Sequence, residues 1–396
     1  MMLFELFLFL LAGIICGVFF GLIPGIHPNT IVLFVPFFLS LSIDPLYLIT
    51  FIVTLGITNS IIDTIPSILL GAPDSGNELS VLPGHKMLLR GQGYDAIKLT
   101  VVGSFYSVVF IFTLLPVFVF LLPPLFSVTK PYIYLLLIGI VGIMILTEKG
   151  KKRIIALFLF FMAGSIGLLA DKIPLNNVLL FFPIFAGFFG ISQLLLGIRN
   201  KIKVPKQKIS DLSLSRKTIT KSSFLGTLAG SASGFLPGVG TSEISSLATV
   251  DKNDKSFLIT LGAITTANTI LSILSLWLIG KSRSGLAVVM DQLFSIGFNE
   301  ILLILFVVLV AGGIAVILTL FLAKKSVGII EKLDYIRVSV VVCIVLFSLT
   351  VVFTGFYGVL LLVTCTALGI LANLIGVKRS ILMGVLILPT ILFYLG

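Results

Sequence analysis

The chain has 396 residues, of which 58% are hydrophobic and 11% are charged. This apolar fraction is far above that of an ordinary soluble domain and indicates a polytopic membrane protein. The formal net charge is +11, but the Lys and Arg residues cluster in short connections between apolar stretches, which is typical of cytoplasmic loops and argues against nucleic-acid binding.

The apolar stretches favour helices over a transmembrane barrel. They are rich in Phe, Leu, Ile and Val, and they lack the dyad alternation of barrel strands. Residues 1–5 contain Glu5 and no Lys or Arg, so we expect a retained first helix and no signal peptide. Uncharged stretches near the length of a bilayer crossing occur at 105–122, 132–146, 154–169, 178–196, 301–322 and 338–352.

Breaks at Gly and Pro divide the first half of the chain. An apolar helix over 4–20 meets a break at 21–28, and a second apolar run over 31–41 stops at Asp44. The run over 46–70 is interrupted by Thr58-Asn59-Ser60 and by Asp63, and a polar segment rich in Gly and Pro follows over 71–94. We expect this polar segment to be a loop or a re-entrant tip.

The second half of the chain repeats the pattern of the first. Gly17, Gly21 and Pro24-Gly25 correspond in order to Gly230, Gly234 and Pro237-Gly238. Further matches pair Asn59 with Asn268, Gly71 with Gly280, Gly150 with Gly355, Gly164 with Gly369, and Pro183 with Pro389. We therefore predict a first transmembrane repeat over 1–198, a basic cytoplasmic linker over 199–221 and a second transmembrane repeat over 222–396.

The charges of matched turns predict that the two repeats are inverted. The basic turn 149–153 corresponds to the uncharged turn 355–358, and Lys378-Arg379 corresponds to a weakly charged turn near 171–172. A basic turn in one half therefore corresponds to a neutral turn in the other, as two halves inserted in opposite orientations require. The prediction is an inverted-topology repeat with broken or re-entrant helices at Pro-Gly motifs, the N-terminus outside and the loops 149–153 and 199–221 in the cytoplasm. Whether residues 4–43 form a re-entrant hairpin or two full crossings stays open.

The two matched breaks are the predicted substrate site. Broken helices present backbone N–H groups and partial positive charge, which suit an anion. The alternative is that the hydroxyl side chains only cap helices and that His27 bonds to backbone. The candidate substrate-binding residues are Gly21, Pro24, Gly25, His27, Asn29, Thr30, Gly234, Pro237, Gly238, Gly240, Thr241 and Ser242.

Polar residues within apolar runs are candidates for cation coupling. Thr58, Asn59 and Asp63 offer the oxygen ligands that sodium prefers, whereas proton coupling needs only the carboxylate of Asp63. The matched region of the second half supplies Thr265 and Asn268 without an acid. Glu243 is the candidate compensating charge. The alternative is hydrogen bonding between helices. Sodium is the one metal considered, and no other cofactor is expected.

Two further tips also correspond. Pro73, Asp74 and Ser75 match a tip that contains Arg283 and Ser284. Arg283 is either a bidentate clamp for a carboxylate or an anchor at the lipid interface. No His-Glu-x-x-His, Gly-x-Ser-x-Gly or Walker motif occurs, so we expect no enzyme.

These motifs resemble a known transporter family. The break at 17–25, its partner at 230–238 and the segment Leu82-Pro-Gly-His-Lys-Met-Leu-Leu-Arg-Gly-Gln-Gly93 resemble the large membrane subunit of the tripartite tricarboxylate transporters, the TctA family. The resemblance implies a cation-coupled secondary transporter of carboxylates such as citrate. It also implies a small membrane subunit and an extracytoplasmic binding protein as partners, although a stand-alone homodimer is the alternative.

The leading hypothesis is therefore alternating-access transport of a small organic anion across the cell membrane. Two other classes stay open. One is a polyprenyl-phosphate or lipid-phosphate translocase, and the other is a non-transporting membrane scaffold subunit in which the breaks serve only packing.

Overall fold

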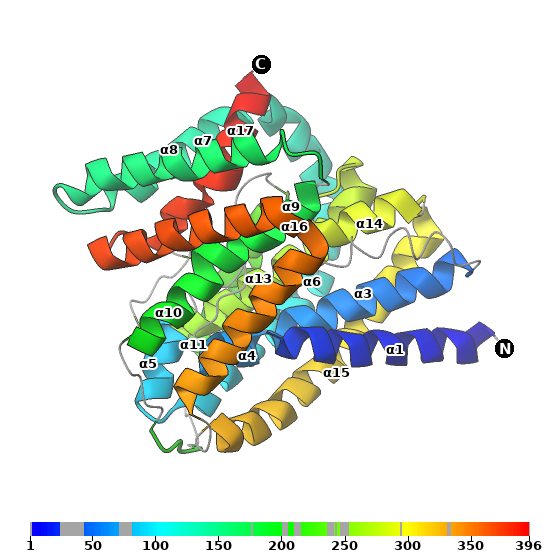
Figure 1. Cartoon of the computed structure of the whole chain (residues 1–396). Helices are drawn as coiled ribbons and strands as arrows, with labels where there is room; N and C mark the ends of the chain where they lie inside the picture. The colour runs from blue at the N-terminus through cyan, green and yellow to red at the C-terminus, as the bar shows by residue number, and fades with distance from the viewer. Residues whose placement is uncertain are drawn as a thin grey trace.

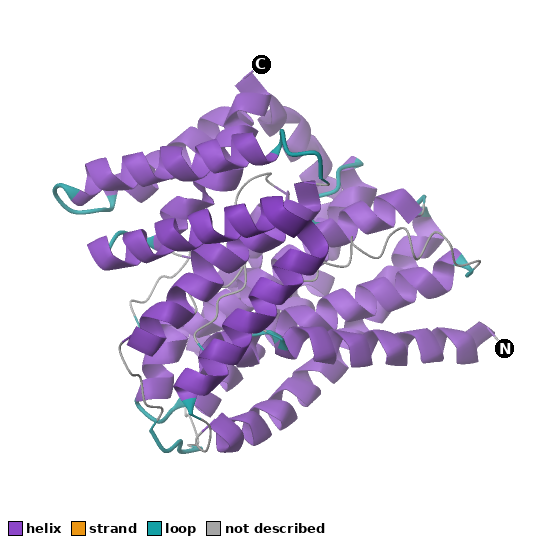
Figure 2. Cartoon of the chain, viewed as in Figure 1, coloured by secondary structure: helices purple, strands orange, loops and turns teal. Residues whose placement is uncertain are grey.

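The computed structural model describes residues 2–23, 43–70, 81–175, 177–199, 205–209, 215–235, 241, 244–245, 253–293, 295–330 and 334–395. Within these ranges the chain is helical and has no strand (Figure 2). Eight of the described helices are long and apolar enough to cross a membrane. The predicted all-α polytopic membrane fold is confirmed.

Figure 1 shows the arrangement of the described helices. Those of the first half are α1 (Met2–Leu22), α3 (Pro45–Ile62), α4 (Thr64–Leu69), α5 (Val81–Leu89), α6 (Gly93–Thr129), the 3-10 turn η2 (Lys130–Tyr132), α7 (Ile133–Leu146), α8 (Lys152–Ala170), α9 (Asn177–Phe185), the π-helical segment η3 (Ala186–Ile191) and α10 (Ser192–Arg199). Those of the second half are α11 (Arg216–Phe235), α13 (Asp254–Ile279), α14 (Gly285–Leu293), α15 (Phe298–Ile330), α16 (Tyr335–Ile375), η4 (Arg379–Met383) and α17 (Gly384–Leu395).

Local capping explains where several helices begin and end. Asp44 accepts a hydrogen bond of 2.8 Å from the backbone N–H of Leu46 at the start of α3, and Asn253 accepts one of 3.1 Å from Lys255 at the start of α13. Gly280 ends α13 with φ 59°, a left-handed conformation that glycine adopts without strain.

The polar residues Thr58-Asn59-Ser60 lie within a continuous helix. The helix α3 runs through them to Ile62 and has Asp63 as its C-cap, and α4 begins at Thr64. Ser60 Oγ donates to the carbonyl of Ile57 at 2.9 Å, so its hydroxyl is satisfied by its own helix. Polar residues that bond within a helix or lie in a cavity need no break in its backbone.

Two pairs of helices pack through matching rows of glycine. On α1, Cβ atoms added at Gly13 and Gly17 would lie 2.7 Å from the Phe51 carbonyl oxygen and 2.7 Å from Thr58 Cβ on α3, and one added at Gly21 would lie 3.0 Å from Ile62 Cβ. On α11, the corresponding glycines approach α13 in the same order. Gly226 meets the Thr260 carbonyl, Gly230 the Ile264 carbonyl and Gly234 the Leu271 side chain. Small residues at every fourth position let membrane helices approach closely.

These contacts also give the direction of each pair. Successive glycines along α1 meet residues of increasing number along α3, and the same holds for α11 and α13. The two helices of each pair therefore run parallel. Ile23 and Ile43 therefore lie at opposite ends of the α1–α3 pair. Residues 24–42, whose crossing was left open by the sequence, lie outside the described residues.

The α1–α3 pair and the α11–α13 pair run in opposite directions. Leu69 lies 3.5 Å from the Cβ position of Gly93 at the start of α6, while Ile57 and Val108 both approach Gly312, so α3 and α6 are antiparallel. α6 and α13 run the same way, because Thr100 meets Gly262 near their beginnings, and Phe126, near the end of α6, lies against Arg283, which follows the end of α13. Consequently α3 runs antiparallel to α13, and α1 runs antiparallel to α11.

The hydrophobic cores combine both halves of the chain. One buried cluster joins residues of α3 to α6 with residues of α13 to α15. A second joins α7 to α9 and η3 with α16, η4 and α17. The predicted repeats over 1–198 and 222–396 thus share their cores, and the repeat boundary stays a prediction.

Matched glycines form turns in both halves. Gly150 lies between α7 and α8, and Gly355 interrupts α16, and both have φ 56°. The backbone of α16 is not helical at Gly355, so the element consists of two helices joined by a kink. An L side chain at either position would be strained.

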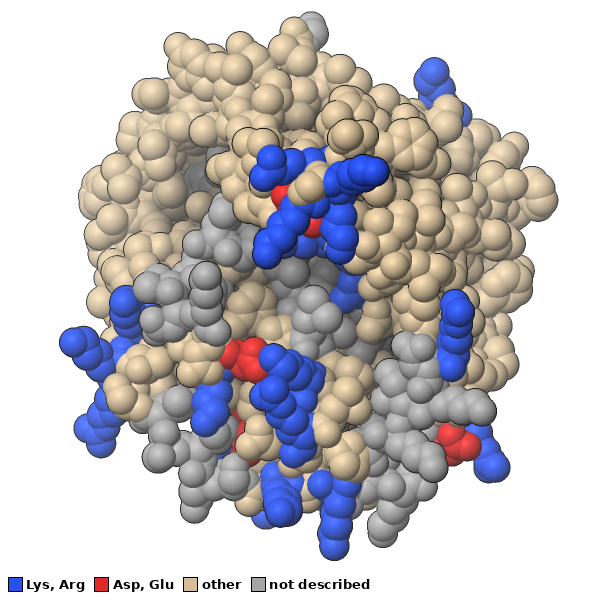
Figure 3. Space-filling model, turned by 90° about the vertical axis from the view of Figure 1, so that its left-hand side faces the viewer, with Lys and Arg blue, Asp and Glu red and all other residues tan. Residues whose placement is uncertain are grey.

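Basic side chains gather on one face of the molecule. The turn before α8, the end of α16, α5 and the end of α10 lie at the left-hand side of Figure 1, opposite the N-terminus. Figure 3 views this side and shows groups of Lys and Arg on either side of a depression.

Candidate functional site

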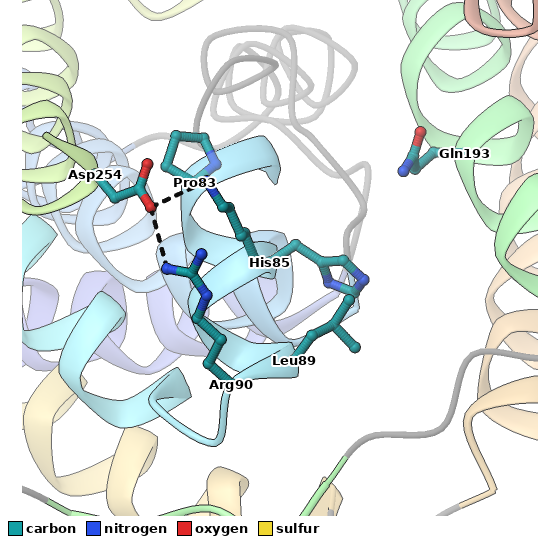
Figure 4. A pocket seen from close by; sticks show the side chains of 7 residues that line it. Pro83, His85, Leu89, Arg90, Gln193 and Asp254 are labelled. Atoms are coloured by element: carbon teal, nitrogen blue, oxygen red, sulfur yellow. Dashed lines mark ion pairs between the residues drawn. The ribbon is translucent and has the colours of Figure 1, made fainter. Parts of the chain in front are cut away.

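A cavity of about 610 Å³ lies between α5, the start of α13 and α10 (Figure 4). Its described lining consists of Pro83, His85, Lys86, Leu89, Arg90, Gln193 and Asp254. In Figure 4, His85 and Leu89 face Gln193 across the open space. The lining combines cations, an acid, an amide and apolar surface, which is the composition of a site for a small polar ligand.

The Pro-Gly pair at the start of α5 positions His85. A Cβ on Gly84 would lie 2.9 Å from Ile68 Cγ1, so glycine lets α5 approach α4 closely. His85 is 9% exposed and forms a hydrogen bond to the backbone of Ile68. Burial lowers the pKa of the His85 imidazole from 6.5, and the Ile68 bond opposes this shift. Near neutral pH, His85 is therefore an uncharged donor or acceptor in the wall.

Two cations, one on α5 and one directly after it, share one carboxylate oxygen. Lys86 Nζ lies 3.5 Å from Oδ2 of Asp254, and Arg90 Nη1 lies 3.6 Å from the same atom. The side chains of Lys86 and Arg90 are 55% and 57% exposed. The three charges leave a net positive potential at the cavity, which favours an anion.

A residue of the linker fixes the corner between α5 and α6. Gln207 Oε1 accepts from the Gly93 N–H at 2.8 Å, and Gln207 Nε2 donates to the Leu88 carbonyl at 3.0 Å. Gly91 has φ 79°, and a Cβ there would lie 2.8 Å from the Lys206 carbonyl oxygen. The Gly-Gln-Gly sequence therefore gives the turn both its left-handed residue and the space for the linker.

The opposite wall is held by residues of the second core. Gln193 Oε1 accepts from Arg379 Nη1 at 3.2 Å, and Arg379 is buried. Glu148 Oε1 accepts from the Lys378 N–H at 2.9 Å, and Lys152 Nζ donates to the Gly376 carbonyl at 2.9 Å. These bonds tie the turn before α8 to the turn after α16.

The candidate cation-coupling residues of the first half lie together on α3. Thr58 and Asn59 are 0% exposed and Asp63 is 7% exposed. Among the described residues, Thr58 Oγ1 and both amide atoms of Asn59 have no hydrogen-bond partner. A buried amide without partners costs about 1–3 kcal/mol, so Asn59 is a candidate ligand for an ion or a polar substrate.

Asn268, which the sequence pairs with Asn59, has a hydrogen-bond partner in the second half. Ser233 Oγ lies 3.0 Å from Asn268 Oδ1, whereas the residue before Gly21 on α1 is Phe20, which carries no donor. Thr265 Oγ1 bonds to the Gly262 carbonyl at 3.1 Å within its own helix. The two halves therefore differ at the position where a ligand could bind, and the unsatisfied position is Asn59.

The remaining described candidates lie at other contacts. Gly21 and Gly234 pack against α3 and α13, and Thr241 is buried. Ser284 Oγ accepts from the Ala287 N–H at 3.2 Å and pairs with Ser272 Oγ at 3.0 Å. Arg283 stacks on Phe126 at 5.1 Å. Pro24, Gly25, His27, Asn29, Thr30, Pro73, Asp74, Ser75, Pro237, Gly238, Gly240, Ser242 and Glu243 lie outside the described residues, and their roles stay predictions.

Sequence reasoning did not assign the residues that line the cavity. His85, Lys86 and Arg90 belong to the motif that carried the family resemblance, and their place after a Pro-Gly pair was the available signal. Gln193 and Asp254 have no local signal, because tertiary packing alone brings them to α5.

The fold and the cavity define a multi-pass helical membrane protein with a basic site between its helices. A family model described as "Tripartite tricarboxylate transporter TctA family" matches residues 7–384. The chain belongs to the TctA family, which provides the large membrane subunits of tripartite carriers, and this membership supports a transport role. The family is one of transporters and not of enzymes.

A curated relative is an uncharacterized protein, MJ1079, of Methanocaldococcus jannaschii. It is 34% identical over 405 residues, and the match covers 98% of each chain. No solved structure matches the chain.

Proposed function

We propose that the protein is a secondary transporter of a small organic anion of the di- or tricarboxylate class. The observation that carries the proposal is the cavity lined by Lys86 and Arg90 in a chain of the TctA family. Arg binds a carboxylate with two parallel hydrogen bonds, and Lys adds a compact charge. His85 and Gln193 add uncharged polar groups for the remainder of such a ligand.

Alternating access is the mechanism that the helix directions support. Matched helices run in opposite directions in the two halves, as α1 does relative to α11. Two similar units with opposite orientation can exchange conformations, which opens one face and then the other around a central site. The basic face of Figure 3 would be cytoplasmic under the positive-inside rule, with the N-terminus outside.

Cation coupling is proposed at α3. Sodium would take the amide oxygen of Asn59 and the hydroxyl of Thr58, both of which lack partners within the described structure. Asp63, one turn further on, would supply the negative charge or, in the alternative, carry a proton. The matched Asn268 is held by Ser233, so we place the coupling site in the first half.

The proposed partners follow from the family. TctA proteins work in tripartite systems with a small membrane subunit and a periplasmic binding protein. Such a binding protein would deliver the anion to the outer face, opposite the basic cavity.

Ligand-induced stabilisation tests the proposal. The purified chain would be heated with di- and tricarboxylates, sugars, amino acids and inorganic phosphate, each with and without sodium. A ligand at about 100 times its Kd adds about 2.7 kcal/mol to the free energy of unfolding. We expect one carboxylate to stabilise the protein, and more strongly with sodium.

Other outcomes of the same experiment separate the competing functions. A flat response to soluble anions together with stabilisation by a polyprenyl phosphate would replace the proposal with lipid-phosphate translocation. A flat response to both classes would favour a scaffold subunit.

A further inference from the structure

We propose that Asp254 is an intramolecular carboxylate that offsets one of the two positive charges of Lys86 and Arg90 in the empty cavity and is displaced by the carboxylate of the incoming anion. The proposal rests on the proposed function and adds a residue that sets its affinity. Asp254 begins α13 in the second half of the chain, whereas Lys86 lies on α5 and Arg90 directly after it, in the first half. The contact is therefore made between halves, inside the cavity that would hold the ligand.

The geometry of the contact is loose. One oxygen of Asp254 serves both cations, at 3.5 Å from Lys86 and 3.6 Å from Arg90. Charge-assisted N–H···O bonds are shorter, at about 2.7–2.9 Å. A diffusing carboxylate is free to align both of its oxygens with the guanidinium of Arg90, whereas the Asp254 carboxylate is tethered to the first turn of α13.

Solvent access makes the exchange easy. The side chains of Lys86 and Arg90 are more than half exposed, and that of Asp254 is 31% exposed. An exposed ion pair changes an equilibrium constant by a factor of about 1 to 5. The cations therefore stay accessible to a ligand, and the loss of affinity caused by competition from Asp254 is small.

The charge count relates the exchange to the class of substrate. With Asp254 in place, the charged lining residues have one positive charge in excess. Once Asp254 is displaced, Lys86 and Arg90 together match a dianion. The Gln193 amide oxygen is engaged by Arg379 at 3.2 Å, which leaves its amide nitrogen to donate to the far end of such a molecule, as its position across the cavity in Figure 4 suggests.

A purely structural role predicts the opposite effects. If the ion pairs only hold α13 against α5, removing the acid weakens the cavity wall and lowers affinity. If Asp254 competes with the ligand, removing it raises affinity. Asp254→Asn keeps the size of the side chain and separates these two roles.

The experiment is a calorimetric titration of the full-length protein in lipid nanodiscs with succinate and citrate. We expect Asp254→Asn to bind the preferred carboxylate about 3- to 10-fold more tightly than the wild type, because two exposed pairs no longer compete. The double variant Lys86→Gln with Arg90→Gln should bind the carboxylate at least tenfold more weakly. Adding Asp254→Asn to this double variant should not restore the affinity.

The charge control is Asp291→Asn. Asp291 is an exposed acid on α14 whose carboxylate pairs with Ser282 at 2.8 Å, outside the cavity. The Asp291→Asn variant should bind the carboxylate like the wild type, which separates a local effect of Asp254 from a general change in surface potential.

Equal or weaker binding by Asp254→Asn, while the wild type binds, would overturn the role of Asp254 and leave the proposed function standing. An equal gain in Asp291→Asn would also overturn it. Absence of binding by the wild type and by every variant would refute the proposed function together with this inference.

Discussion

Gly103 on α6 and Gly262 on α13 lie where the backbones of the two halves meet. A Cβ on Gly103 would overlap the Ile259 carbonyl, and one on Gly262 would overlap the Thr100 carbonyl. Ser104 Oγ bonds to the Gly262 carbonyl at 3.1 Å, and Ser107 Oγ bonds to the Ala263 carbonyl at 3.0 Å. The first core therefore depends on a close crossing of one helix from each half.

Substitution at this crossing should destabilise the protein. Gly262→Ala adds one methyl group against a backbone carbonyl that cannot move aside, and overpacking of this kind costs about 1–3 kcal/mol. Thermal unfolding in detergent would measure the loss. Gly313→Ala is the matched control, because a Cβ there has no neighbour within 4 Å. Equal melting temperatures for both variants would contradict the close crossing.

The two matched asparagines should respond oppositely to the same change. Asn59→Leu removes two unpaired amide atoms, so the sodium-free protein should gain about 1 kcal/mol of stability and lose its response to sodium. Asn268→Leu breaks the bond to Ser233 and should lose about 1 kcal/mol. Melting curves with and without sodium would measure both effects. A retained sodium response in Asn59→Leu would exclude Asn59 as a ligand.

Acidification should destabilise the wild type through His85. The pKa of His85 is lowered from 6.5 by burial, so the unfolded chain takes up a proton at a higher pH than the folded chain. The contribution of His85 to stability is therefore complete above about pH 6.5 and falls as the pH drops below that value. His85→Gln keeps a hydrogen-bond donor and should show a smaller loss between pH 7.5 and 5.5. Parallel pH profiles would disprove the assignment.

The linker residue Gln207 should affect ligand binding from outside the cavity. Gln207→Ala removes the bonds to Gly93 and Leu88 and should cost about 1–2 kcal/mol. Because these bonds fix the corner that follows Arg90, the affinity for the anion should fall as well. Lys208→Ala is the control, since the Lys208 side chain is exposed and only its backbone N–H bonds to Gly91, at 2.7 Å. Unchanged affinity in Gln207→Ala would limit its role to folding.

The membrane fold was predictable because its signals are local. Long uncharged stretches predict spans, and the order of Gly17 and Gly21 against Gly230 and Gly234 predicted a correspondence that the structure extends to matching contacts on α3 and α13. Gly150 and Gly355 were paired on sequence alone, and both adopt φ 56°. Glycine is informative here because close approach and positive φ each require it.

The cavity was not predictable, since its parts are distant in the chain. Asp254 and Gln193 are unremarkable in sequence, and they meet α5 only through the packing of α13 and α10. The partners of the polar residues in α3 were not predictable either, because polarity along a helix does not reveal which side chains bond internally, as Ser60 does to Ile57. The predicted breaks at Pro24-Gly25 and Pro237-Gly238 stay predictions.

The most direct test of the account is counterflow in proteoliposomes. Vesicles that contain the protein and are loaded with unlabelled carboxylate would be diluted into a trace of the same carboxylate carrying a radioactive label. We expect the wild type to accumulate the label transiently and the variant Lys86→Gln with Arg90→Gln to accumulate none, while Asp291→Asn behaves like the wild type. No accumulation by the wild type for any carboxylate, or equal accumulation by the double variant, would contradict an anion transporter that uses this cavity.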